Sequence, residues 1–206
     1  MIFVLSIFPF RYVRINVRIG QSISFLIKTN NLIVPVSALF ITLPSHYYRS
    51  MSDTKNLLIV AHNPSSNTQK LVAATLRGAT HEDIEGIEVK YIPPLQAVAD
   101  DVLWADAIIL GTTENFGYMS GALKDFFDRI YYPCLELTEA MPFATYIRAG
   151  LDGTGTKIAI GKITTGLKWK AVQESMILHG EYRSEFEDQC EELGMLMAAS
   201  LESGII

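Results

Sequence analysis

The stretch from Leu57 to Leu71 reads LLIVAHNPSSNTQKL. Its first four residues are apolar without a break, which is typical of a strand buried on both faces of a parallel sheet. A run of Asn, Pro, Ser, Ser, Asn and Thr comes soon after them, and a helical pattern then begins. The stretch therefore predicts a strand, a short polar loop and a helix, which together form the first unit of an α/β fold.

Strands and helices continue to alternate toward the C-terminus. Strands are predicted at 56–63, 86–94, 107–113, 142–150 and 171–178. Helices are predicted at 67–77, 95–106, 120–136, 156–167 and 186–201, with Gly78 as the C-cap of the first and Pro133 bending or ending the third. Segment 156–167 also alternates like a strand, but neighbouring parallel strands need a crossover of about a dozen residues, which favours a helix there.

Five strand–helix units in a row predict an α/β fold with a doubly wound, five-stranded parallel sheet and helices on both of its faces. In such sheets a ligand binds outside the carboxyl ends of the strands, where the strand order reverses. We therefore expect function in three loops, at 62–68, 112–120 and 148–156.

The charge of the chain changes abruptly near Met51. The 206 residues carry a net charge of −5, which gives no support to nucleic-acid binding, yet residues 1–50 contain five Lys or Arg and no acidic residue. Three interpretations of this N-terminal extension remain open: upstream sequence read from a mispredicted start, a targeting segment, or a structural extension. No apolar run reaches the roughly 18 residues that a membrane span needs. We expect the folded domain at 51–206.

The cysteines and histidines predict neither a disulfide framework nor a metal site. Cys134 and Cys190 are the only two cysteines, and both lie in helical apolar patterns, so buried thiols in a reducing cytoplasm are expected. The four histidines show no ligand spacing. His62 and His179 lie near strand ends and are interpreted as structural or solvated.

The first loop has the chemistry of a phosphate site. Backbone N–H groups at a helix start are unpaired and carry partial positive charge. The loop lacks both G-x-x-x-x-G-K-[ST] and G-x-G-x-x-G, which argues against a triphosphate or a dinucleotide held in the usual way. Its hydroxyl and amide groups suit a phosphate monoester; they belong to Asn63, Ser65, Ser66, Asn67 and Thr68. The alternative is that Ser65 or Ser66 only caps the helix.

The second loop adds aromatic surface at the same edge. Phe116 and Tyr118 flank Gly117, directly after the third predicted strand. Their rings offer a flat surface to a planar ligand, and glycine permits a tight turn or a close approach. The alternative for each aromatic side chain is packing in the core.

With the loop HNPSSNT and the segment NFGYMSGALKDFFDR, residues 54–206 resemble the flavodoxin-like fold family, and within it the NAD(P)H-dependent FMN and quinone reductases. Residues 1–50 take no part in this resemblance. It implies a flavodoxin-like fold with FMN as cofactor. It also implies that the FMN phosphate lies on the first loop, at Ser65, Ser66, Asn67 and Thr68, and the flavin ring beside Thr113, Glu114, Asn115, Phe116 and Gly117. The third loop, with Arg148 and Gly150, would close the other side of the ring.

The resemblance further implies an enzyme that moves hydride or electrons from NADH or NADPH through FMN to a quinone-like or flavin acceptor. The flavin carries that chemistry, so we nominate no catalytic side chain. A carboxylate at Glu114 would oppose an anionic reduced flavin, and Arg148 would favour it. A flavodoxin-type electron carrier and a flavin-free interaction module remain as alternatives. A homodimer or homotetramer is expected by analogy.

Overall fold

The computed structural model describes residues 2–7, 10–16, 25–29, 32–36 and 54–206. The chain divides into two compact units, Met1–Ser50 and Met51–Ile206. The first unit contains an antiparallel sheet in the order β1-β2-β3-β4. Its strands are Ile2–Ile7 (β1), Phe10–Asn16 (β2), Phe25–Thr29 (β3) and Leu32–Val36 (β4). The origin of this extension stays a prediction, and residues 37–53, where the charge changes, lie outside the described residues.

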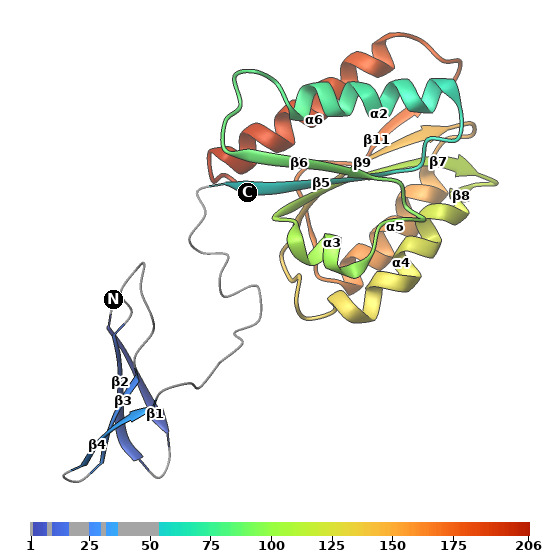
Figure 1. The fold of residues 1–206 in the computed structure, drawn as a ribbon. Helices are drawn as coiled ribbons and strands as arrows, with labels where there is room; N and C mark the ends of the chain where they lie inside the picture. The colour runs from blue at the N-terminus through green and yellow to red at the C-terminus, as the bar shows by residue number, and fades with distance from the viewer. Residues whose placement is uncertain (1, 8–9, 17–24, 30–31, 37–53) are drawn as a thin grey trace. The chain divides into compact units, whose positions relative to one another are not determined.

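The second unit is built on a parallel sheet in the order β6-β5-β7-β9, with β10 and β11 both paired to β9 (Figure 1). Its strands are Lys55–Ala61 (β5), Ile87–Ile92 (β6), Ala107–Asn115 (β7), Pro142–Ala149 (β9), Lys170–Ala171 (β10) and Met176–His179 (β11). The predicted parallel sheet is confirmed. The fifth strand, expected at 171–178, is split into two short strands; residues 172–175 between them are not in a strand, although the backbone N–H of Val172 still donates to the Phe143 carbonyl at 2.9 Å.

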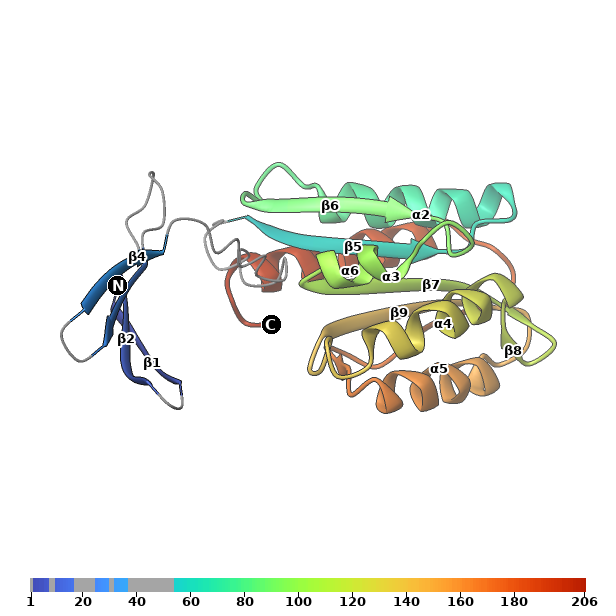
Figure 2. The ribbon, with the colours of Figure 1, turned by 60° about the horizontal axis from the view of Figure 1, so that its bottom comes forward.

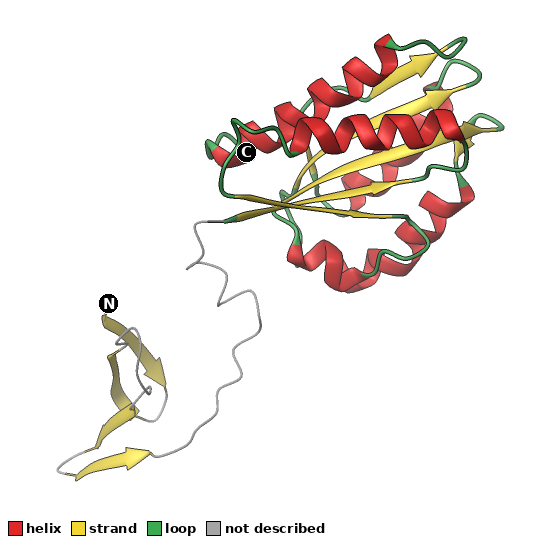
Figure 3. Cartoon of the chain, turned by 45° about the horizontal axis from the view of Figure 1, so that its top comes forward, coloured by secondary structure: helices red, strands yellow, loops and turns green. Residues whose placement is uncertain are grey.

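Five helices cover both faces of this sheet (Figure 3). They are Ser66–Ala79 (α2), Ala99–Trp104 (α3), Gly121–Cys134 (α4), Thr154–Gly166 (α5) and Glu185–Glu202 (α6). One buried cluster joins the sheet to α2 and α6, and the other joins it to α3, α4 and α5. The ambiguous segment at 156–167 is therefore a helix, as expected, and it fills the crossover between β9 and the fifth strand.

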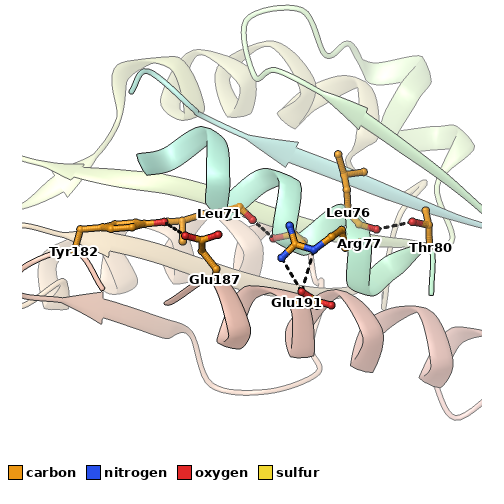
Figure 4. Close-up of polar contacts among 8 residues, drawn as sticks. Leu71, Leu76, Arg77, Thr80, Tyr182, Glu187 and Glu191 are labelled. Carbon is orange, nitrogen blue, oxygen red and sulfur yellow. Dashed lines mark hydrogen bonds and ion pairs between the residues drawn. The ribbon is translucent and has the colours of Figure 1, made fainter. Parts of the chain in front are cut away.

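The predicted cap at Gly78 is wrong, because this glycine lies inside α2 where α6 crosses it. A Cβ on Gly78 would stand 1.8 Å from the backbone oxygen of Glu191, and one on Gly194 would stand 2.1 Å from that of Thr75. Arg77 also donates to the Glu191 carboxylate at 2.7 Å across this crossing (Figure 4), although an exposed ion pair contributes little. The two glycines therefore set the separation of the helices, and α2 ends at Ala79 with Thr80 as its C-cap.

Replacing either crossing glycine with alanine tests this packing. Gly78→Ala and Gly194→Ala should each lower the free energy of unfolding by about 3 kcal/mol. The added methyl group would meet backbone atoms of the facing helix, and these atoms cannot shift unless the helix around them shifts too. Gly161→Ala in α5 is the matched control, since its Cβ meets nothing within 4 Å. It should raise stability by roughly 0.5–1 kcal/mol. Urea titrations of the three variants measure this, and equal effects at all three positions would contradict the packing account.

The two cysteines are free and buried, as predicted. Burial raises the pKa of the Cys134 thiol to about 11, with the charge of Asp100 adding to the shift, and it raises the pKa of Cys190 to about 12. The reactive thiolate is therefore scarce at neutral pH. In the folded chain at pH 8, we expect neither thiol to react with a disulfide reagent on the timescale of a free cysteine, and both to react after denaturation. Rapid labelling of the native protein would contradict this.

Candidate functional site

The three loops expected to carry function lie at one edge of the sheet. β5, β7 and β9 run parallel, with Ala61 paired to Gly111 and Thr113 paired to Arg148, so their carboxyl ends finish side by side. Figure 2 shows this edge, where the short strand Tyr118–Met119 (β8) folds back on β7. From β5 the chain passes to β6, which lies on one side of β5, and then to β7, which lies on the other side of β5. The strand order therefore reverses between β5 and β7, which is where open α/β sheets bind ligands.

The first loop begins α2 with a complete capping box. The backbone N–H of Ser65 donates to Thr68 Oγ1 at 2.9 Å, and that of Thr68 donates to Ser65 Oγ at 3.3 Å. Ser65 is thus the N-cap, as the alternative interpretation held. Within the described part of the chain, no hydrogen bond engages the side chains of Asn63, Ser66 or Asn67. These three therefore remain available to a ligand, while Ser65 and Thr68 shape the turn.

A histidine beside this loop has an unsatisfied buried atom. His62 follows β5, and its backbone N–H donates to the Gly111 carbonyl at 2.9 Å. Its ring atom Nδ1 is buried without a hydrogen-bond partner, and burial lowers the pKa of the ring, which is therefore neutral at pH 7. Buried polar atoms nearly always have a hydrogen-bond partner, so this nitrogen is a candidate to form a hydrogen bond with a ligand. From the sequence alone His62 is interpreted as structural or solvated, because its place at a strand end is the one signal that it carries.

The second loop is a hairpin whose tip has an unusual composition. Asn115 pairs with Tyr118, and the two residues between them, Phe116 and Gly117, have φ values of 53° and 74°. Such a turn favours Asn–Gly, and a bulky residue in the left-handed region is strained by about 1–3 kcal/mol. Phe116 is also fully exposed, at 106% of its reference area. Neither core packing nor backbone preference explains this side chain, which points to a role in binding.

Buried hydroxyl groups fix the base of the hairpin. Thr112 Oγ1 accepts from the backbone N–H of Ser120 at 3.1 Å and donates to its hydroxyl at 3.1 Å. Ser120 Oγ in turn accepts from the backbone N–H of Leu123 and caps α4. Both side chains are buried, so each of these bonds is costly to break. The hairpin therefore leaves the sheet in one defined direction.

The third loop is held against this hairpin by Glu114. Its Oε2 accepts from the backbone N–H of Leu151 at 2.7 Å, and its Oε1 accepts from that of Gly153 at 3.2 Å. A Cβ on Gly155 would stand 2.1 Å from the carbonyl oxygen of Gly117, so the hairpin tip also touches the first turn of α5. The second and third loops therefore form one connected structure.

Arg148 has a different environment from the one that its charge suggested. Its guanidinium donates to the carbonyl oxygens of Ala149 at 2.6 Å, Leu178 at 2.9 Å and Gly180 at 2.5 Å. It also lies 5.5 Å from the centre of the Phe186 ring. All of its hydrogen bonds in the described part of the chain serve the ends of β9 and β11. Its contribution at this edge is therefore to hold backbone in place.

The remaining predicted residues lie at the same edge. Thr113 donates through its hydroxyl to the side-chain oxygen of Asn115 at 3.0 Å. Gly150 is exposed, and a Cβ there would meet nothing within 4 Å. The structure thus brings every predicted residue to the carboxyl edge. In the described ranges it contains no group of three metal-binding side chains and no helix suited to crossing a membrane.

Comparisons with known proteins agree with this fold. Residues 54–152 match the model of the NADPH-dependent FMN reductase family. A flavodoxin of Aquifex aeolicus strain VF5 is 27% identical over 158 residues, which cover 69% of this chain and 84% of that protein. Among solved structures, an archaeal flavodoxin matches with a TM-score of 0.61 and 17% identity, over 71% of this chain and 99% of its own. The WrbA-like flavodoxin of Agrobacterium tumefaciens matches with a TM-score of 0.58 and 17% identity, over 73% and 99%.

The parallel sheet, its helical layers and its loop-built edge define a flavodoxin-like protein. Within that class, residues 54–152 are similar to the NADPH-dependent FMN reductase family, and the chain over 158 residues is similar to a flavodoxin. The family match ends at Asp152, so it includes the first two loops and the beginning of the third.

The strain at Phe116 can be tested by relieving it. Phe116→Asn should stabilise the chain by about 1 kcal/mol, because asparagine tolerates the left-handed region and no ring remains in water. This corresponds to a rise in Tm of roughly 2–4 °C. Phe116→Ala keeps the unfavourable backbone conformation and serves as the control, with a smaller gain expected. A Phe116→Asn variant less stable than the wild type would show that the ring packs against the fold and would contradict this interpretation.

Proposed function

We propose that the chain is an FMN-dependent oxidoreductase that passes hydride or electrons from NADH or NADPH, through bound FMN, to a quinone-like or flavin acceptor. The observation that carries this proposal is the joint presence, at one sheet edge, of an open helix start and a strained, exposed aromatic turn. The family match over 54–152 supports the same conclusion.

The first loop fits the FMN phosphate. An anion is stabilised at a helix start, and the first turn of α2 contains no acidic residue, whereas that of α6 contains three. In this proposal the phosphate is held by the first-turn N–H groups and by the free side chains of Asn63, Ser66 and Asn67, with Ser65 and Thr68 shaping the turn. His62 is the first residue of this loop, and its buried, unsatisfied Nδ1 fits a polar ligand there.

The second and third loops fit the flavin ring. Residues Thr113 to Gly117 would lie along the ring, with Phe116 offering its exposed face, and Gly150 and Arg148 would lie on the other side. Bound FMN supplies the hydride and electron chemistry, so the role of these residues is to bind and orient it and to control access. No side chain of this chain is proposed to act as a catalytic acid or base.

A second candidate is a flavodoxin-type electron carrier without NAD(P)H activity. The relative at 27% identity bears the name flavodoxin, and residues 51–206 hold all 22 acidic residues, a surface charge that steers redox partners. A flavin-free interaction module is a third candidate, to be excluded by flavin uptake. A cytoplasmic location and a homodimeric or homotetrameric state remain predictions.

Flavin uptake and turnover together separate these candidates. The full chain should bind FMN with a saturable change in flavin fluorescence, and the complex should oxidise NADH or NADPH when a quinone is present. The double variant Ser66→Ala/Asn67→Ala should weaken FMN binding about tenfold or more, because each lost hydrogen bond is worth about 0.5–1.5 kcal/mol. Ser203→Ala, at the C-terminal end of α6, is the control and should bind as the wild type does.

Each failure has its own meaning in this experiment. Flavin binding without oxidation of either pyridine nucleotide would favour the electron carrier. An absence of flavin binding would reject both redox candidates and leave the interaction module. Unchanged affinity in the double variant would reject the assignment of the phosphate to the first loop.

A further inference from the structure

We propose that Glu114 is a positioning residue that sets the gap between the β7–β8 hairpin and the loop connecting β9 to α5. These two segments are the ones proposed to flank the flavin ring, so the inference rests on the proposed function of the site. It assigns to the Glu114 carboxylate a mechanical role through the backbone of the third loop, in place of a direct electrostatic effect on the ring.

Both oxygens of the carboxylate are used in this contact. One accepts from Leu151 N–H at 2.7 Å and the other from Gly153 N–H at 3.2 Å. Hydrogen bonds from backbone N–H groups to an ionised carboxylate are stronger than neutral ones. The side chain of Asp152 accepts from Thr154 N–H at 2.9 Å in the same segment. Acidic side chains therefore determine the backbone conformation of 151–154.

The third loop has little freedom to rearrange once this contact is made. Gly153 has φ of 73°, and a Cβ there would stand 2.7 Å from the side chain of Ile177 on β11. Beyond it, Gly155 lies directly against the Gly117 carbonyl. The loop is thus in contact with the hairpin on both sides of Phe116, at Glu114 and at Gly117. Because Gly150 immediately precedes the tied segment, its distance from the hairpin depends on Glu114.

Direct and mechanical roles predict different effects of Glu114→Gln. This substitution preserves shape but places an amide NH₂ where one of the two backbone N–H groups needs an acceptor. If the carboxylate acts by its charge, the flavin midpoint potential should rise while the affinity for oxidised FMN stays the same. If it acts by holding the loop, the affinity for oxidised FMN should fall, and the amide protons of Leu151 and Gly153 should exchange faster even without flavin.

The experiment compares the full-length wild type with Glu114→Gln and Glu88→Gln. Glu88 is the matched control, because it is an exposed acid on β6, paired with Asn56 near the opposite end of the sheet. FMN affinity is measured by fluorescence titration, the midpoint potential by dye equilibration, and amide exchange by NMR on the flavin-free chain. For Glu114→Gln we expect about tenfold weaker binding of FMN and at least tenfold faster exchange at the two amides. Glu88→Gln should match the wild type in both.

Two results would overturn the inference. The first is wild-type FMN affinity in Glu114→Gln, and a raised midpoint potential at that unchanged affinity would identify a direct charge effect. The second is unchanged exchange at Leu151 and Gly153. Each of these leaves the proposed function intact when the wild type binds FMN. A wild type that binds no FMN overturns the proposed function and this inference together, and is recognised before any variant is compared.

Discussion

The structure depends on the close packing of three central strands just before their carboxyl ends. A Cβ on Gly111 of β7 would stand 2.4 Å from the ring of Tyr146 on β9 and 2.6 Å from the Cβ of Ala61 on β5. Tyr146 is among the largest fully buried side chains, so this contact admits only glycine at its centre. It holds β5, β7 and β9 in one register. The loops that follow them therefore begin at fixed positions relative to one another, which makes a shared site at that edge geometrically possible.

On this base, the site is assembled by polar contacts to backbone. Thr112 and Ser120 close the hairpin, and Glu114 ties it to the third loop. Arg148 likewise donates hydrogen bonds to backbone carbonyls at the ends of β9 and β11. Charged and hydroxyl side chains near the edge are thus largely committed to holding loops in place. Among the residues that the structure describes, only a few side chains at this edge are exposed and not used in this way. Phe116 is one of them, and these side chains are available to a ligand.

Much of the fold follows directly from local sequence pattern. Apolar runs such as 57–60 and 107–110 identify buried strands, and helical spacing of apolar residues identifies the segments between them. The positions of the three loops follow from strand order alone. By contrast, the role of Gly78 depends on Gly194, which is 116 positions away, and the division of the fifth strand depends on its pairing with β9. Contacts of this kind carry no local signal.

The candidate site also divides into features that local sequence reveals and features that depend on contacts distant in the chain. The polar composition of 62–68 and the aromatic turn at 116–118 are visible in the sequence, because their chemistry is local. The partners of Glu114 and Arg148 are not visible there, since most of them are backbone groups 30 to 39 positions along the chain. The sequence gives no sign of the role of His62 for a related reason: whether a ring nitrogen is buried and unsatisfied is decided by tertiary packing. The backbone strain at Phe116 likewise cannot be recognised without its φ value, which only the structure supplies.

We propose that the loops following β5, β7 and β9 form one binding site for FMN. Backbone NMR spectra of the full chain, recorded during titration with FMN, test it most directly. We expect the largest amide shift changes to fall within 62–68, 112–120 and 148–156 and to saturate together with a single dissociation constant. Changes centred on the opposite edge of the sheet, or separate affinities for the three segments, would contradict it.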